Sequence, residues 1–236
     1  MLMFETLRKP KGIAVIAVFA ALHAVLSSLP YTITIGVGGG SITLGIITAP
    51  LIGIILGPIS GGVAVTIGSI IGMFINPSGA IFGLLSFLPP TFGAFSAGFS
   101  FKKMGYVSAA MILGSILIFY SNPNGMEASL YPFLHIIALI LGLAFSTRLA
   151  IWSTDGSKIE KLGIGIPIAA FIGTLTDHIL GSAFAIWIFN LPAPVWNTII
   201  FVYPIERIVA VIITTAIAIP LYYSLKRSGM LNIIKI

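Results

Sequence analysis

YPIERIVAVIITTAIAIPLYY, residues 203–223, places a carboxylate and a guanidinium side by side near the start of a long apolar run. A helix crosses the hydrocarbon core of a bilayer, about 30 Å thick, with about 20 mainly apolar residues, so this stretch predicts a transmembrane helix. Charged side chains inside such a helix are energetically costly and usually mark a binding site or a structural pair. The contacts of Glu206 and Arg207 are therefore the first question that the sequence raises.

The composition as a whole is that of a membrane protein. Of 236 residues, 58% are hydrophobic and 8% are charged, with a mean hydropathy of +1.12, whereas a soluble domain would carry about a quarter charged residues. We therefore expect a multi-pass protein of the cell membrane, embedded in the lipid bilayer. The formal charge of +6 predicts orientation in the membrane rather than a nucleic-acid partner, because the basic residues form no basic face. The chain has no cysteine, which excludes disulfides and thiolate chemistry.

Eight apolar segments predict an all-α fold: a polytopic membrane helical bundle of about eight transmembrane segments, forming one integral membrane domain over residues 1–236. Segments two and three are short and are joined by GPISGG, so a re-entrant pair is an alternative to two full spans. Pro89 and Pro90 fall inside the fourth segment and should kink or break it. The predicted segments are 12–29, 42–57, 59–75, 79–99, 106–120, 132–151, 164–189 and 198–225.

The connections between these segments predict the orientation. With eight spans, the eleven Lys and Arg residues other than Arg207 lie at or beyond segment ends on one side, and the opposite connections carry none. By the positive-inside rule, both termini should be cytoplasmic. On the outer side, residues 31–43 alternate Thr and Ile before a run of glycines, which predicts an extended lid.

Ionisable residues inside the predicted helices form the candidate binding site. They are Asp177, His178, Glu206 and Arg207, with His23 and His135 as weaker candidates. All of them should lie in the outer half of the bundle or near its midplane, where a solute captured from outside would bind.

Helix geometry suggests which of these side chains interact with one another and which contact the solute. Neighbouring residues point about 100° apart, so Glu206 and Arg207 should not satisfy one another. Asp177 on the preceding helix is the expected partner of Arg207, which leaves Glu206 for His178, His23, a backbone donor or the solute. The alternative is a buried structural ion pair without a ligand.

Three aromatic residues lie near the mouth of the same helix pair. Trp187, Trp196 and Tyr203 could stack on a flat ring of the solute, and the alternative is that they anchor the helices at the membrane interface. Taken alone, His23 is more typical of a satisfied packing histidine than of a ligand contact.

Small residues recur at three- and four-residue spacing and let another helix backbone approach closely within lipid. For the glycines we expect packing within the chain. For the alanine face of the first helix, packing within the chain and docking of a second protein stay open as alternatives. The residues concerned are Ala14, Ala17, Ala20, Ala21 and Ala24, and the pairs or triplets Gly53-Gly57-Gly61, Gly68-Gly72 and Gly79-Gly83.

The order of these features resembles the substrate-binding S components of energy-coupling factor (ECF) transporters. The resemblance covers residues 12–103 and 164–227. The first helix carries small-xxx-small alanines, and a short second helix ends in a Gly-Pro-x-x-Gly turn (Gly57, Pro58, Gly61). The third helix bears glycines, and the fourth ends in basic residues. The last helix, which begins YPIERIV, has a polar start and a basic end. That family usually has six helices, so residues 104–151 depart from its pattern as an additional hairpin.

The resemblance implies high-affinity binding of a vitamin or similar small water-soluble micronutrient by a protein that is not itself an enzyme. Uptake would need a separate transmembrane coupling subunit and a pair of ABC ATPases, and this sequence contains no Walker motif. Ala17, Ala21 and Ala24 would form the docking surface for the coupling subunit. No cofactor and no metal are expected, since three widely spaced histidines form no recognisable zinc site.

Two other classes of function are open. A stand-alone proton-coupled secondary transporter would use Asp177 or Glu206 as its proton site, and the lack of a convincing inverted repeat weighs against it. An intramembrane enzyme is disfavoured because Asp177 and His178 diverge on one helix and no G-x-S-x-G or H-E-x-x-H motif accompanies them.

Overall fold

The computed structural model describes residues 10–29, 43–146 and 159–231, and the regular structure in these residues is entirely helical. The expected all-α fold is confirmed for this part of the chain. The predicted lid at residues 31–43 lies outside the described residues, apart from Thr43. The elements are α1 (Pro10–Ser28), α2 (Gly45–Leu56), α3 (Pro58–Ile75), η3 (Pro77–Gly79), η4 (Gly83–Phe87), α4 (Leu88–Phe101), α5 (Gly105–Tyr120), α6 (Pro123–Glu127), α7 (Phe133–Ala144), α9 (Ile159–Phe189), α10 (Ala193–Ile199) and α11 (Tyr203–Arg227).

Five of the described helical segments are long and apolar enough to cross a bilayer: Pro10–Ser28, Pro58–Ile75, Gly83–Phe101, Ile159–Phe189 and Tyr203–Arg227. Large apolar side chains stay exposed on the outside of the bundle, for example Val18 (67%) and Leu117 (60%), as expected for a surface that faces lipid rather than water. The chain is therefore a multi-pass helical membrane protein. Three further apolar helices, α2, α5 and α7, have 12, 16 and 12 residues and fall short of the usual spanning length of about 20.

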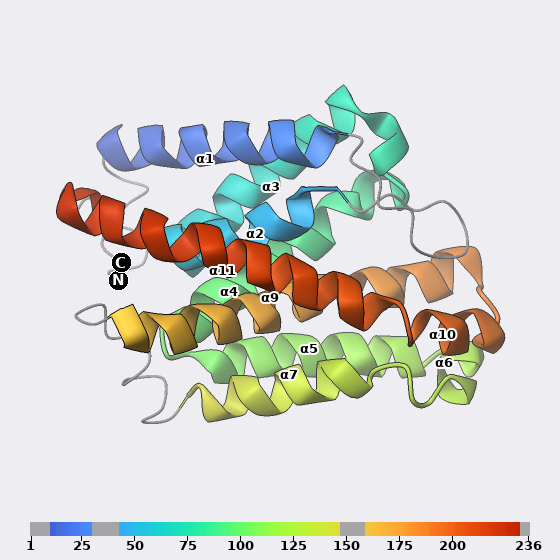
Figure 1. The fold of residues 1–236 in the computed structure, drawn as a ribbon. Helices are drawn as coiled ribbons and strands as arrows, with labels where there is room; N and C mark the ends of the chain where they lie inside the picture. Colours follow the sequence, from blue (N-terminus) through green and yellow to red (C-terminus); the bar gives the residue numbers. More distant parts are fainter. Residues whose placement is uncertain (1–9, 30–42, 147–158, 232–236) are drawn as a thin grey trace.

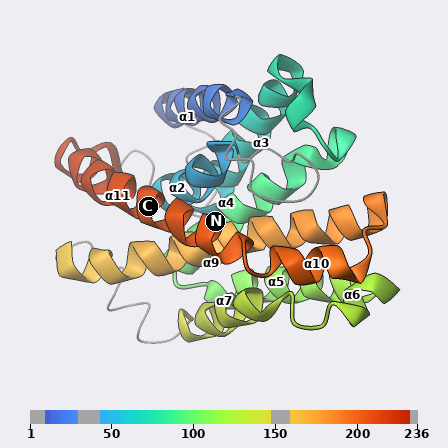
Figure 2. The ribbon, with the colours of Figure 1, turned by 45° about the vertical axis from the view of Figure 1, so that its right-hand side comes forward.

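Helix α9 lies at the centre of the bundle and contacts α2, α4, α5, α7 and α11. Figures 1 and 2 show α1 and α3 at one edge and the α5–α7 pair at the other, with α4 and α9 between them. The segment predicted as a hairpin, 104–151, forms α5, α6 and α7 in its described part, and both long arms pack on α9. This pair is thus part of the wall that supports the centre of the molecule.

Glycines bring the central helices into backbone contact. A Cβ added to Gly53 would lie 2.1 Å from the carbonyl oxygen of Ala94, and one added to Gly61 would lie 2.8 Å from the Cα of Gly53. The expected packing within the chain is confirmed for these glycines. It is wrong for Gly79 and Gly83, where an added Cβ would meet nothing within 4 Å, because the chain there forms short 3-10 turns rather than a packed helix.

Two proline positions correct the predicted helix bounds. Of the two outcomes predicted for Pro89 and Pro90, the break occurs rather than the kink: the predicted segment 79–99 divides into 3-10 turns and α4, which begins at Leu88. Both prolines then lie in the first turn of α4, where a missing N–H costs nothing. In the same way Pro204 occupies the first turn of α11, so the predicted segment 198–225 divides into α10 and α11. Glu206 consequently lies in the first turn of α11, nearer the helix end than a start at residue 198 implies.

Candidate functional site

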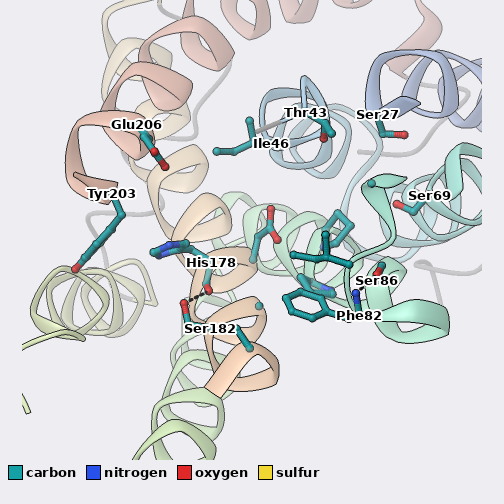
Figure 3. Close-up of a pocket in the computed structure, with 18 of the residues that line it drawn as sticks. Ser27, Thr43, Ile46, Ser69, Phe82, Ser86, His178, Ser182, Tyr203 and Glu206 are labelled. Atoms are coloured by element: carbon teal, nitrogen blue, oxygen red, sulfur yellow. Dashed lines mark hydrogen bonds between the residues drawn. The ribbon is translucent and has the colours of Figure 1, made fainter. Parts of the chain in front are cut away.

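A cavity of about 390 Å³ opens between α1, α3, η4, α9 and α11. Its volume is in the range of small-molecule sites, about 300–1,000 Å³. Two sides of the cavity differ in character. The charged wall consists of Asp177, His178, Tyr203, Glu206 and Arg207, and the neutral wall of His23, Ser27, Ser69, Asn76 and Ser86. Figure 3 shows Glu206, Tyr203 and His178 on one side and Ser27, Ser69 and Ser86 on the other.

Close helix packing holds Asp177 at the cavity. A Cβ added to Gly93 of α4 would lie 2.9 Å from the Cβ of Asp177 and 3.0 Å from the carbonyl oxygen of Gly173. The absence of a side chain at Gly93 therefore lets α4 and α9 approach, and Asp177 is fixed between this contact and the cavity. Among the described residues, no hydrogen-bond or ion-pair partner occurs for the Asp177 carboxylate.

Glu206 and Arg207 form no hydrogen bond with one another, as predicted, whereas the predicted ion pair of Arg207 with Asp177 does not occur in the described residues. Arg207 Nη2 lies 4.0 Å from Glu206 Oε2, and within the described chain no ion pair joins Arg207 to Asp177, although its positive charge also acts on Asp177. Neighbouring side chains leave a helix about 100° apart, but the aliphatic chain of Arg207 is long enough to bring its guanidinium back toward Glu206. The separation is too long for a hydrogen bond. Arg207 Nε is buried and has no hydrogen-bond partner in the described residues.

Polar contacts behind the charged wall assign the protons of two histidines. The hydroxyl of Ser182 donates to the His178 carbonyl (2.8 Å), so the Tyr131 hydroxyl donates to Ser182 Oγ (2.7 Å). His178 Nε2–H then faces the Tyr131 oxygen at 3.4 Å, and His178 Nδ1 accepts from His135 Nε2–H at 3.0 Å. In this arrangement one proton on each ring is enough to satisfy every contact, so neither histidine needs a positive charge. His135 Nδ1 is left buried without a partner in the described residues.

The same side chains form an aromatic cluster. Tyr203 packs against His178 with ring centroids 4.7 Å apart and donates its hydroxyl to the Tyr131 carbonyl at 2.9 Å. Trp196 lies 4.9 Å from the Tyr131 ring. This cluster ties α9, α10 and α11 to the α5–α7 pair and makes the charged wall rigid.

The two tryptophans of the candidate site lie in different environments. Trp196 is 3% exposed and lines the cavity, with its indole N–H donated to the Leu191 carbonyl. Trp187 is 53% exposed, donates to the Ile118 carbonyl and lies outside the cavity lining. The prediction of a solute contact is therefore wrong for Trp187, because its position on α9 faces outward.

His23 is a bridge between helices in the neutral wall. Its Nδ1 lies 2.6 Å from Thr48 Oγ1 of α2 and its Nε2 lies 3.0 Å from Ser69 Oγ of α3, and the side chain is fully buried. Both ring nitrogens are satisfied, as expected for a packing histidine. His23 also lines the cavity.

Sequence reasoning missed Tyr131 and Ser182 as supports of the site, and it named His135 only as a weaker ionisable candidate, without its contact to His178. His135 and Ser182 lie on α7 and α9, and Tyr131 directly precedes α7. The spacing of His178 and Ser182 by one helical turn was a local signal. The contribution of residues 131–135 had no such signal, because it depends on how the α5–α7 pair packs against α9.

The predicted docking alanines of α1 differ in exposure. Ala17 and Ala21 are exposed, next to Val18 at 67% exposure. Ala24 is 2% exposed, and its carbonyl lies 3.3 Å from the position of an added Cβ on Gly72 of α3. Ala24 therefore packs within the chain and is not available to a second protein.

Comparison with known proteins adds a relative without an assigned role. The chain is 34% identical over 163 residues to MJ0923, an uncharacterized protein of Methanocaldococcus jannaschii, and the match covers 68% of this chain and 54% of the relative. The chain thus spans about half the length of that protein. No family model matches the sequence, and no solved structure matches it.

Proposed function

We propose that this chain is a membrane-embedded binding protein that captures a small, polar, water-soluble micronutrient in the cavity between its charged and neutral walls. The observation that carries the proposal is that seven of the eight predicted solute-contacting residues line one cavity of ligand size. They are His23, Asp177, His178, Trp196, Tyr203, Glu206 and Arg207.

Binding without chemistry fits the hydrogen bonds of the site. His178 is bonded to His135 and Tyr131, whereas acyl transfer needs a histidine between a nucleophilic hydroxyl and an orienting carboxylate. Arg207 Nε is buried without a hydrogen-bond partner in the described residues, and no ion pair of Asp177 occurs there. A bound solute would satisfy both groups.

In the cell, the chain would serve as the S component of an ECF-type transporter, with about eight spans, both termini cytoplasmic, a transmembrane coupling subunit and a pair of ABC ATPases. Two observations support this. The 12-residue α2 ends at Leu56, Gly57 follows it with a φ of 77°, and Pro58 begins α3. Lys11, Lys102, Lys103, Lys226 and Arg227 lie at helix ends, away from the end of α9 and the start of α11 that frame the cavity (Figure 1).

Binding is tested with the purified chain in detergent. Small molecules retained from a mixture of water-soluble vitamins are identified by mass spectrometry, and their affinity is measured for the parent protein and for Glu206→Ala and Arg207→Ala. We expect both variants to lose binding while they stay folded. Glu127→Ala is the matched control, since Glu127 is an exposed carboxylate of α6. Equal affinity in all four proteins would rule out this site.

A stand-alone proton-coupled carrier that uses Asp177 or Glu206 is the second candidate, and the unpaired Asp177 carboxylate is the observation that favours it. Liposomes that contain this chain alone distinguish the two. A carrier takes up the solute when a pH gradient is applied, whereas an S component binds it without accumulation until the coupling subunit, ATPases and ATP are added.

A further inference from the structure

We propose that the solute carries one net positive charge, on a flat ring or planar group at one of its ends, and that this charge is held by Asp177 at the charged wall. This inference rests on the proposed function and adds the electrostatic class of the solute. It depends on the charges that line the cavity, the neutrality of the histidines and the separation of the two walls.

The charges at the cavity do not balance. Asp177, Glu206 and Arg207 are the charged members of the described lining. Arg207 Nη2 offsets Glu206 at 4.0 Å, which leaves the charge of Asp177. Glu206 and Arg207 side chains are 8% and 12% exposed, so little water is available to screen the remainder. A poorly solvated carboxylate without a partner is costly, and a bound cation removes that cost.

The histidines do not supply the missing charge. The contacts of His178 with Tyr131 and His135 are both satisfied when His178 carries a single proton. A second proton on His178 Nδ1 would face the Nε2–H of His135 at 3.0 Å and would stand in the field of Arg207. At the neutral wall, Thr48 donates to main-chain carbonyls, so His23 Nδ1–H donates to Thr48 and Nε2 accepts from Ser69. The site thus has a net charge of −1.

The walls fix where the charge of the solute lies. Every charged side chain of the described lining is on α9 or α11, whereas the opposite wall offers hydroxyls and one carboxamide, Ser27, Ser69, Ser86 and Asn76. Tyr131, Trp196 and Tyr203 line the cavity beside the charges, and aromatic rings attract cations, more strongly where water is excluded. A planar cation, which is less strongly hydrated than a compact ammonium, suits this wall, and the remainder of the solute is uncharged and polar.

The test uses three probes that share one ring and differ in charge: 1-methylnicotinamide (cation), nicotinamide (neutral) and nicotinate (anion). Each is added to the purified parent protein, to Asp177→Asn and to the control Glu127→Gln, and dissociation constants are measured by calorimetry. In parallel, the vitamin mixture is passed over the same proteins and the charge of each retained solute is read by mass spectrometry.

We expect the parent protein and Glu127→Gln to bind the cation at least about 10-fold more tightly than the neutral probe, and to retain a cationic solute from the mixture. In Asp177→Asn, which keeps the size of the side chain, the preference should fall below about 3-fold. A parent protein that prefers the neutral or anionic member, or an Asp177→Asn protein with unchanged preference, overturns the charge assignment and leaves the proposed function intact. A parent protein that retains no solute from either set overturns both.

Discussion

The neutral and charged walls of the cavity differ in whether their polar side chains have partners within the protein. On the neutral wall, both nitrogens of buried His23 have partners, on α2 and α3. On the charged wall, Asp177 has no partner among the described residues and Arg207 Nε is buried without one. A buried polar group that is satisfied contributes to stability, whereas one that is unsatisfied weakens the fold unless a ligand completes it.

This difference teaches where to look for function in a helical membrane protein. Polarity inside the bundle is not sufficient, because His23 is as buried as any side chain of the charged wall. Buried polar atoms without a partner in the described residues also occur outside the cavity, on Thr174, Thr215 and Tyr223. A binding wall is therefore distinguished by unpaired groups that line a cavity of ligand size, here Arg207 Nε and the Asp177 carboxylate. Substitutions should therefore affect affinity on the charged wall and stability on the neutral wall.

The largest effect is expected for Glu206→Gln. Replacing the carboxylate by an amide of equal size removes the charge that offsets Arg207 and turns one of the two acceptor oxygens at the cavity into an N–H donor. We expect affinity for the retained solute to fall about 100-fold, or about 2.7 kcal/mol, with a melting temperature within a few degrees of the parent. Calorimetric binding and thermal unfolding in the same detergent check both values, and a large fall in melting temperature would place Glu206 among the structural residues instead.

His23→Leu should show the reverse pattern. The substitution removes the bonds to Thr48 and Ser69 and leaves the buried Ser69 hydroxyl without its ring partner. We expect the free energy of unfolding to fall by about 2 kcal/mol, since a buried group left unsatisfied costs about 1–3 kcal/mol. The fraction that stays folded should bind within about 3-fold of the parent. Chemical unfolding monitored by circular dichroism gives the first value. A protein of unchanged stability that no longer binds would make His23 a solute contact.

The sequence predicted the residues of the charged wall better than the residues that pack behind them. Asp177, Glu206 and Arg207 could be found because ionisable residues are rare in apolar helices. Their pairing could not be found, since the approach of Arg207 to Glu206 depends on rotamers rather than on helix projection. His135 lies 43 residues before His178 in the chain, and nothing local links the two. The start of α11 does have a local signal in Pro204, because proline is favourable in a first turn.

The two tryptophans offer a matched pair that compares the cavity with the lipid-facing surface. Trp196→Leu removes a ring that is 3% exposed and packs on Phe119 and Tyr131 in the cluster behind the charged wall. We expect affinity to fall about 10-fold, or about 1.4 kcal/mol. Trp187→Leu changes an outward side chain, 53% exposed, and should change affinity less than 2-fold. Direct titration of both variants decides this, and equal losses would indicate that the tryptophans act through the membrane interface.

The smallest effect is expected for Tyr131→Phe, which tests whether the α5–α7 pair acts on the charged wall. The variant keeps the ring that packs on Tyr203 and Trp196 but removes the hydroxyl bonded to Ser182 and facing His178 Nε2. His178 then lacks the acceptor that fixes its proton on Nε2, while its contact with His135 persists. A single hydrogen bond contributes about 0.5–1.5 kcal/mol, so affinity should fall about 3-fold. The control is Tyr120→Phe, whose hydroxyl donates to the Ser129 carbonyl at the exposed end of α5 and should leave binding unchanged. If both variants bind like the parent, His178 does not need Tyr131 to hold its tautomer, and the hairpin contributes packing rather than proton placement to the site.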